Sequence, residues 1–269
     1  MNEETYFEGV KSYKLLAKKE VGQNFLVDPS IAKRIVSLLE ATEGEKILEI
    51  GCGAGSLTYF LSEGPAKSEA IDIDEGLLLK LNKDFEGNSY LNIHQGNAMK
   101  FDYSPYDKII GNLPYYITTG IIENALLGAK EATRMVFMVQ KEAADRLLAK
   151  PRSKDYSALG VYLQYVAKAR KAFSVPRTAF LPMPNVDSTV LCFEIDPEKH
   201  NQEAEGMYRL AEKLFLNRRK TVYNNLRSLL KDEEKAKKAL ETAGISPTAR
   251  PEELVAKDYF ALLKEIAKE

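Results

Sequence analysis

Short apolar segments that alternate with helical segments constrain the fold of this chain more than any other feature of its sequence. Apolar stretches of strand length occupy residues 46–50, 69–73, 90–94, 106–110 and 134–139. Segments with the apolar spacing of a helix lie between them, at residues 56–61, 75–85 and 118–127. Strands and helices that alternate in this way form a parallel sheet with helices on both faces. The chain is therefore predicted to have an α/β fold, with residues 169–175 and 188–195 as its last, hairpin-like strands.

The pattern changes near residue 200. From residue 203 to the C-terminus the apolar residues recur only at helical spacing, as Tyr208, Ala211 and Phe215 do. We therefore expect two domains, an α/β domain over residues 1–200 and a smaller all-helical domain over residues 201–269.

Composition excludes several classes of protein. The apolar runs are far shorter than the roughly 20 residues of a membrane span, and the acidic N-terminus has no apolar signal segment. The chain has two cysteines and two histidines, so neither a disulfide framework nor a metal site is expected. We expect a protein of the reducing cytoplasm with no membrane association.

A net charge of −1 hides two basic stretches. Residues 141–181 contain nine basic and three acidic side chains, and residues 209–231 contain seven basic and one acidic, so each stretch carries a local charge of +6. Concentrated positive charge of this kind favours binding to a polyanion such as a nucleic acid. The alternative is that these residues form the solvated faces of ordinary helices.

A glycine-rich turn follows the first strand of the alternating pattern. Gly51, Gly53 and Gly55 have the spacing G-x-G-x-G, which allows a ligand close to the backbone at the start of the next helix. Asp72 follows 21 residues after Gly51, where a carboxylate can accept hydrogen bonds from both hydroxyls of a ribose. Because dinucleotide sites have the spacing G-x-G-x-x-G, S-adenosylmethionine is the expected cofactor in preference to NAD.

Two other polar residues belong to the same expected edge of the sheet. Asp74 competes with Asp72 for the ribose, and Asn97 follows the third strand, where it can reach the edge of an adenine. The alternatives are a purely structural glycine turn and, for Asn97, an ordinary turn residue.

The segment Asn112-Leu113-Pro114-Tyr115 follows the fourth strand and opens beside the glycine turn. The amide oxygen of Asn112 and the backbone carbonyl of Leu113 can each accept one N–H of an amine conjugated to a planar group. These bonds would hold the nitrogen toward tetrahedral geometry and direct its lone pair at a methyl donor. Pro114 fixes the turn, and Tyr115 offers a stacking surface worth about 1–3 kcal/mol per base. Adenine, cytosine and glutamine side chains all present such an amine, and the alternative is an ordinary strand-to-loop turn.

Five segments in order resemble the KsgA-type ribosomal RNA adenine dimethyltransferases, over essentially the whole chain. They are an N-terminal signature at residues 22–28, a cofactor loop at 49–58, a catalytic loop at 112–115, a proline-rich loop at 180–188 and a basic segment at 217–221. The resemblance implies a Rossmann-like methyltransferase domain that uses S-adenosylmethionine, and a helical domain that docks on RNA or the ribosome. It also implies transfer of two methyl groups to each of two adjacent adenosines near the 3′ end of 16S ribosomal RNA, within the small subunit or its precursor.

The resemblance also implies roles for single residues. Residues 1–30 are expected to contribute to the cofactor site, where the implied contacts are Asn24, Leu26, Gly51, Gly53, Asp72, Asn97 and Asn112. Phe180 is expected to join Tyr115 as a second aromatic side chain for the target base, with core packing as the alternative. The expected phosphate-binding surface, on one helix, is made of Arg218, Arg219 and Lys220.

This chain departs from the family pattern at two positions. Position 97 is usually aspartate in the family, so Asn97 is expected to weaken cofactor binding without abolishing it. Glu20 stands where the family commonly has a basic residue, and Lys18 and Lys19 are the candidates to replace that charge. Tyr116, next to the catalytic loop, is expected to serve ordinary packing.

Three other functions remain as alternatives. Large-subunit ribosomal RNA adenine methylases of the antibiotic-resistance type share the catalytic loops, but residues 180–188 and 218–220 favour the small-subunit activity. A non-catalytic ribosome assembly factor is disfavoured by the intact segment 112–115, and a protein-glutamine methyltransferase by the two basic stretches. The protein is expected to act as a monomer.

Overall fold

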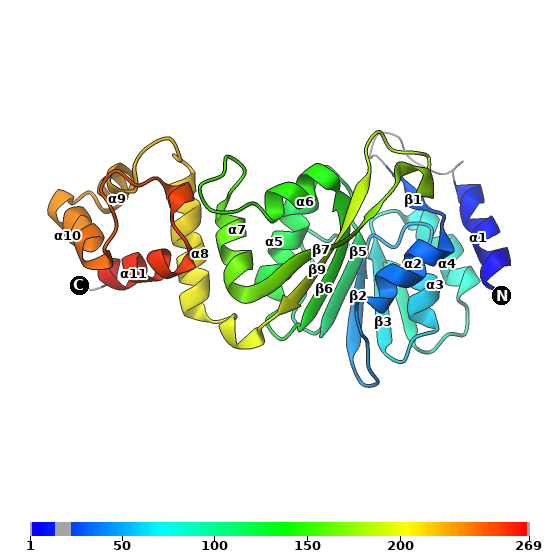
Figure 1. Ribbon diagram of the computed structural model, residues 1–269. Coiled ribbons are helices and arrows are strands. Elements are labelled where there is room, and N and C mark those ends of the chain that lie inside the picture. Colours follow the sequence, from blue (N-terminus) through cyan, green and yellow to red (C-terminus); the bar gives the residue numbers. More distant parts are fainter. Residues whose placement is uncertain (1, 14–22, 268–269) are drawn as a thin grey trace. The chain divides into compact units, whose positions relative to one another are not determined.

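The computed structural model describes residues 2–13 and 23–267 of the chain (Figure 1). The chain separates into two compact units, of which the first comprises Met1–Ala144 and Ala169–Ile195. The second comprises Asp145–Lys168 and Asp196–Glu269. The predicted division at residue 200 differs from this one chiefly in that Asp145–Lys168 groups with the C-terminal helices.

The first unit is built on a seven-stranded sheet with the strand order β4-β3-β2-β5-β6-β9-β7. The strands are β2 (Lys46–Ile50), β3 (Lys67–Asp72), β4 (Leu91–Gln95), β5 (Lys108–Asn112), β6 (Arg134–Gln140), β7 (Ala167–Val175) and β9 (Ser188–Ile195). The strands β2 to β6 are all parallel to one another, and β9 runs antiparallel to β6. The predicted α/β class is therefore confirmed, and β7 and β9 are neighbours as expected.

The direction of chain progression reverses between β2 and β5. β3 and β4 extend the sheet on one side of β2, whereas β5 and β6 extend it on the other. The loops that leave β2 and β5 therefore diverge, and a crevice opens between them at the carboxyl edge of the sheet. Because Ile50 is in register with Gly111, the two strands end at nearly the same level. The glycine turn and the segment 112–115 consequently begin side by side.

Helices cover both faces of this sheet. α2 (Pro29–Ser37), α3 (Ser56–Ser62) and α4 (Glu75–Asp84) lie on one face, and α5 (Thr118–Gly128) lies on the other (Figure 1). Asp28 begins α2, because its carboxylate accepts hydrogen bonds from the two amides that follow Pro29. Asp74 begins α4 in the same way.

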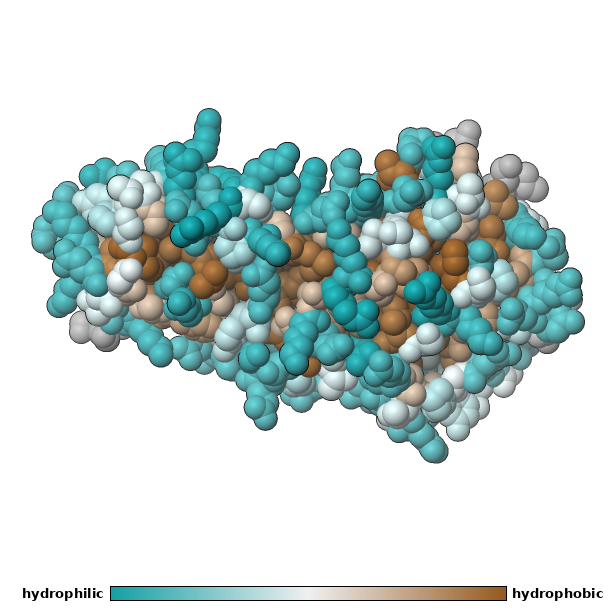
Figure 2. Space-filling view, in the orientation of Figure 1, coloured by the Kyte–Doolittle hydropathy of each residue, from teal (hydrophilic) through white to brown (hydrophobic). Residues whose placement is uncertain are grey.

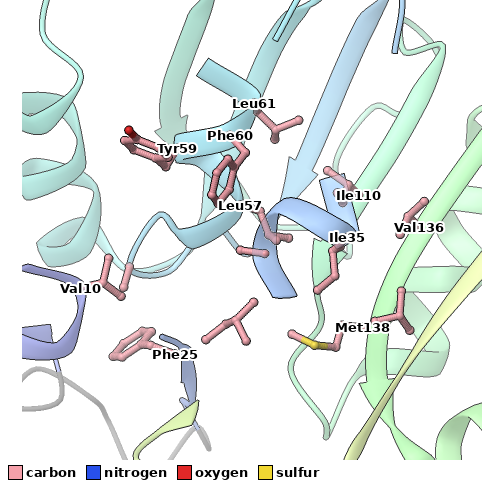
Figure 3. Packing of buried hydrophobic residues seen from close by; sticks show 14 of the residues in the cluster. Val10, Phe25, Ile35, Leu57, Tyr59, Phe60, Leu61, Ile110, Val136 and Met138 are labelled. Atoms are coloured by element: carbon pink, nitrogen blue, oxygen red, sulfur yellow. The ribbon is translucent and has the colours of Figure 1, made fainter. Parts of the chain in front are cut away.

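The first face of the sheet carries a large apolar cluster of the unit's core (Figure 3). Ile35 of α2 and Leu57 of α3 pack with Ile110, Val136 and Met138 of the sheet, and all five are at most 3% exposed. Burying each such side chain contributes about 1.5–3 kcal/mol before the cost in conformational entropy. The loops at the carboxyl edge therefore stand on a tightly packed support.

Two features of this unit were not predicted. One is helix α1 (Glu3–Ser12), which adds Tyr6, Phe7 and Val10 to the apolar core. The other is a small antiparallel sheet, in which β1 (Phe25–Leu26) pairs with β8 (Phe180–Leu181). This pairing joins the N-terminal segment to the proline-rich loop.

The second unit is helical. Its helices include α7 (Ala158–Val166), α8 (Gln202–Phe215), α9 (Val222–Leu230), α10 (Glu233–Ala243) and α11 (Ala256–Ile266), and α6 (Lys141–Leu147) lies where the chain enters it. The side chains of Asn201, Thr221 and Asp232 cap α8, α9 and α10. α7 groups with this unit because it packs against α8 and α11, which cover its largely apolar surface.

Hydrophilic side chains cover most of the molecular face seen in Figure 2. Among the described residues, no helix combines the length and the apolar character needed to cross a bilayer. Cys52 and Cys192 are both buried and form no disulfide.

Candidate active site

A pocket lies at the carboxyl edge of the parallel strands. It encloses about 1110 Å³ of space, counting the part that is open to solvent, which is ample for a small-molecule ligand. Its walls come from residues at or just after the ends of β2, β3, β4 and β5, and from the segment 23–26. The structure brings together in these walls the predicted cofactor residues Asn24, Leu26, Gly51, Gly53, Asp72, Asn97 and Asn112.

The glycine turn at residues 51–55, called the glycine loop from here on, has backbone conformations that other residues rarely adopt. Gly51, Gly53 and Gly55 have φ angles of 70°, 53° and 83°. The amides of Gly51 and Cys52 both donate to the carbonyl of Ile71 on β3, at 2.8 and 3.1 Å. These bonds tie the backbone of the loop to the neighbouring strand. Residues 51–54 of the loop line the pocket.

Asp72 holds the glycine loop from the pocket side. Its Oδ2 accepts a hydrogen bond from the Gly53 amide at 2.9 Å, and its Oδ1 accepts one from the Asp74 amide, also at 2.9 Å. Burial raises the pKa of Asp72, although these two amides oppose the shift. Asp74 instead caps α4 through the Gly76 amide and accepts from Gln23 Nε2 at 3.2 Å. Of the two candidate carboxylates, Asp72 is the one in the pocket wall.

A second carboxyl group, that of Glu49, lies in the same wall beneath the glycine loop. It is 1% exposed, and its Oε2 accepts a hydrogen bond from Thr58 Oγ1 at 2.6 Å. Burial raises the pKa of Glu49 to about 8. At neutral pH this carboxyl is therefore mostly protonated and adds little negative charge beside Asp72.

Asn112 is the last residue of β5, two residues beyond the predicted end of that strand. Its register with Met138 of β6 and the bond from the Leu113 amide to the Met138 carbonyl, at 3.0 Å, fix its backbone. Its Nδ2 donates to the backbone carbonyl of Asn24 at 3.4 Å. Since the amide nitrogen is used in this way, the amide oxygen is the atom placed to accept an N–H in the pocket.

Hydrogen bonds to the carbonyl of Pro114 stabilise the turn that follows. The carbonyl of Pro114 accepts from Thr118 Oγ1 at 2.9 Å and from the Ile117 amide at 3.3 Å. These bonds lead directly into α5, so the turn is continuous with a helix.

Tyr115 lies in the pocket wall and is partly buried. Its hydroxyl is 3.3 Å from Oγ of Ser188, a buried residue at the start of β9. Burial raises the pKa of Tyr115, so the ring remains a neutral phenol. Tyr116, expected to pack, is 64% exposed and lines the pocket, so that expectation is wrong.

Phe180 lies elsewhere. It is 1% exposed, belongs to the apolar core and pairs with Leu26 in the small sheet. The structure does not bring it into the pocket wall beside Tyr115. Its surroundings match the alternative, core packing, because its side chain is buried in the apolar cluster.

Asn97 serves as a turn residue and also lies in the pocket wall. It lines the pocket, and its Oδ1 accepts a hydrogen bond from the Met99 amide at 2.9 Å, as a turn residue would. An oxygen has two lone pairs, so this bond leaves one for a ligand.

Arg218, Arg219 and Lys220 do not lie on a helix, contrary to expectation. α8 ends at Phe215, and these residues form the turn before α9. The helix ends there because the side chain of Asn225 donates to the carbonyls of Leu214 and Asn217, both at 3.3 Å.

The three cations of this turn differ in their surroundings. Arg218 donates to the carbonyls of Lys154 at 2.6 Å and Ser153 at 3.5 Å, and it forms an ion pair with Glu252 at 3.7 Å. Arg219 and Lys220 are exposed. Arg218 thus stabilises the second unit, and the other two cations offer the surface charge.

Gln23, Ser188 and Tyr6 also shape the site and were not assigned roles from the sequence. Gln23 and Ser188 lay inside two of the matched segments, so the resemblance could have indicated them. Tyr6 carried no such signal, because it contacts the glycine loop from 48 residues away. The predicted roles of Lys18, Lys19 and Glu20 concern positions outside the described residues.

Comparison with known proteins places this chain in a family. The family model described as ribosomal RNA adenine dimethylase matches residues 14–268. The "Ribosomal RNA small subunit methyltransferase A" of Streptococcus thermophilus strain CNRZ 1066 is 37% identical over 268 residues, which cover 94% of this chain and 92% of that protein. The protein of the same name from Pseudomonas fluorescens strain Pf0-1 is 35% identical, and the match covers 96% of this chain and 96% of that protein.

Solved structures show the same architecture. A dimethyladenosine transferase from Plasmodium falciparum matches with a TM-score of 0.77 and 27% identity, over 90% of this chain and 96% of that one. The 23S rRNA methyltransferase ErmE matches with a TM-score of 0.67 and 22% identity, over 91% of this chain and 100% of that one. At that identity the second likeness concerns the fold alone.

Proposed function

Since the chain belongs to the ribosomal RNA adenine dimethylase family, we propose that it dimethylates N6 of two adjacent adenosines in a loop near the 3′ end of 16S ribosomal RNA. The observation that carries this proposal is the position of Asn112 and Tyr115 in the wall of the same pocket as the glycine loop and Asp72. Methyl donor and acceptor would therefore meet in one pocket.

The proposed cofactor is S-adenosylmethionine, and the residues of the pocket fit it. Asp72 can accept hydrogen bonds from a ribose, because its carboxylate lies in the pocket wall at the end of β3. Asn97 can accept one from an adenine amine, and the glycine loop admits a ligand close to its backbone. When bound, this cofactor supplies a methyl group already activated on a sulfonium sulfur.

Asn112 and Leu113 orient the acceptor nitrogen. The amide oxygen of Asn112 and the carbonyl of Leu113 each accept one N–H of the adenine amine, which draws the nitrogen out of conjugation with the ring. Strand pairing with Met138 and the bond from Asn112 to Asn24 hold both acceptors in place before the base arrives. Preorganised polar groups of this kind are usually the largest single contribution to rate enhancement.

Tyr115 holds the base itself. Its ring gives a flipped adenine a stacking surface, and the contact with Ser188 restrains that ring. A base inside a duplex cannot reach this pocket, so the target adenosines must be unpaired or in a loop.

Sequence similarity favours the small-subunit substrate over the large-subunit one. Relatives at 35–37% identity over more than nine-tenths of the chain are named for the small subunit. The likeness to the 23S enzyme is one of fold, at 22% identity. The intact segment 112–115 argues against a purely non-catalytic assembly role.

The test of this proposal uses purified small and large ribosomal subunits from a strain that lacks the dimethylation. We expect tritiated methyl groups from S-adenosylmethionine to enter the small subunit alone, with primer-extension stops at two adjacent adenosines near the 3′ end. Label confined to the large subunit would support the antibiotic-resistance type of activity and overturn the proposal.

We further propose that the protein works in the cytoplasm as a monomer. The unpaired, buried Cys52 and Cys192 suit a reducing compartment. Light scattering coupled to gel filtration is expected to give the mass of one chain, 30.2 kDa. A dimer at working concentration would contradict the monomeric assignment.

A further inference from the structure

The hydroxyl group of Tyr6 contacts the glycine loop from outside the pocket. It lies 3.3 Å from the carbonyl oxygen of Ala54 and 3.2 Å from that of Gly55, so it donates to one or both. Burial raises the pKa of Tyr6, which keeps the hydroxyl protonated and able to donate. A residue near the start of the chain thus binds the loop that carries the predicted cofactor glycines.

Because Gly55 has no side chain, the Tyr6 hydroxyl can occupy the space beside it. A Cβ at position 55 would stand 2.3 Å from the Tyr6 hydroxyl oxygen, well inside any real contact distance. The carbonyl of Gly55 also accepts the Tyr59 amide at 2.9 Å, the bond that begins α3. Glycine at the third position of the G-x-G-x-G pattern is therefore required by the contact with α1 as much as by a ligand.

Helix α1 is held firmly against this loop. The ring of Tyr6 stacks on that of Tyr59 with centroids 4.7 Å apart, and Tyr6, Phe7 and Val10 are all at most 4% exposed. Because these contacts orient the ring, the hydroxyl has little freedom to move away from the loop.

The glycine loop therefore has two anchors. Asp72 binds the Gly53 amide in the pocket wall, and the Tyr6 hydroxyl, which does not line the pocket, lies within hydrogen-bond distance of the next two carbonyls. We propose that Tyr6 is a positioning residue for the cofactor site and that docking of α1 is energetically coupled to cofactor binding. This inference rests on the proposed function, since it takes S-adenosylmethionine as the ligand.

Coupling of this kind is reciprocal. If docked α1 favours the loop geometry that binds the cofactor, the bound cofactor must stabilise docked α1 to the same extent. The reverse effect can be measured without any substitution, as slower hydrogen exchange of the backbone amides in α1.

The experiment measures the Kd of S-adenosylmethionine by calorimetry for the full chain and for two hydroxyl deletions. Tyr6→Phe removes the contact with the loop and is expected to raise the Kd about 5-fold, the effect of one net hydrogen bond. Tyr13→Phe is the matched control, because the Tyr13 hydroxyl is also buried but donates to Asp84 at 3.3 Å, on α4. Its Kd is expected to stay within about 2-fold of the unmutated value.

Hydrogen exchange in residues 3–12 gives the second readout. We expect S-adenosylmethionine to slow it in the unmutated chain and in Tyr13→Phe, and to slow it less in Tyr6→Phe. Two results would overturn this inference and leave the proposed function intact. One is an equal Kd for Tyr6→Phe and the unmutated chain, and the other is hydrogen exchange in α1 at the same rate with and without the cofactor. Failure of the unmutated chain to bind the cofactor would instead refute the proposed function on which the inference rests.

Discussion

Replacing Glu49 by glutamine should change how the stability of the protein depends on pH. In the unfolded chain this carboxyl loses its proton near its ordinary pKa of 4.5, whereas burial in the folded protein raises the pKa to about 8. Between these two values the folded state binds more protons than the unfolded state. Stability contributed by the protonated group is therefore complete below pH 4.5 and is lost as pH rises toward 8.

The size of the loss follows from the two pKa values. They differ by about 3.5 pH units, and each unit corresponds to about 1.4 kcal/mol, so about 5 kcal/mol is the upper bound. Relaxation of the site and water entry reduce this figure, and a loss of about 2–4 kcal/mol is expected. Glutamine has nearly the same shape, its oxygen can accept the bond from Thr58, and it does not titrate.

The assay is chemical denaturation of both proteins at pH 5, 7 and 9. Carboxyl groups away from this site titrate equally in the two proteins, so the difference between their free energies of unfolding isolates Glu49 and its coupling to Asp72. We expect Glu49→Gln to gain about 2–4 kcal/mol relative to the unmutated protein between pH 5 and pH 9. A constant difference across this range would show that Glu49 is ionised in the folded protein and would refute the reasoning.

Other substitutions separate the roles assigned to single side chains. Tyr115→Ala should lower kcat/KM for methyl transfer roughly 5- to 150-fold, which corresponds to losing about 1–3 kcal/mol of stacking. Tyr115→Phe keeps the ring and should keep most of the rate. Equal losses in the two variants would contradict a stacking role. Arg219→Ala and Lys220→Ala should each weaken RNA binding and reduce the slope of log K against log salt by about one. Arg218→Ala should mainly lower the Tm, because its guanidinium bonds two backbone carbonyls, and an unchanged Tm would contradict that role.

The sheet and the pocket were predictable because they depend on local patterns. Each parallel strand is a short apolar segment, and the carboxyl ends of such strands must share one edge of the sheet. The residue types at those ends therefore predicted that Gly51, Asp72, Asn97 and Asn112 would meet. The ends of β5 and β3 were misplaced by one or two residues, since pairing with neighbouring strands sets where a strand ends.

The remaining features depend on contacts between distant parts of the chain. Phe180 lies in a proline-rich loop in sequence, and its burial depends on packing with residues far along the chain, including Leu26 of β1. The helix expected at Arg218 ends early because of Asn225, a residue of the following helix. Tyr6 acts on a loop far along the chain, so no spacing rule could have indicated it.

The most direct test of the central claim concerns Asn112 and compares two quantities on one substrate, the unmethylated small subunit. We expect Asn112→Ala to lower single-turnover methyl transfer, at saturating S-adenosylmethionine, by about 100-fold or more, while its affinity for the subunit changes by less than about 2-fold. Asn112→Asp, which keeps an oxygen acceptor, should transfer methyl groups at a rate between those of the unmutated protein and Asn112→Ala. Methyl transfer by Asn112→Ala at the unmutated rate would contradict the account.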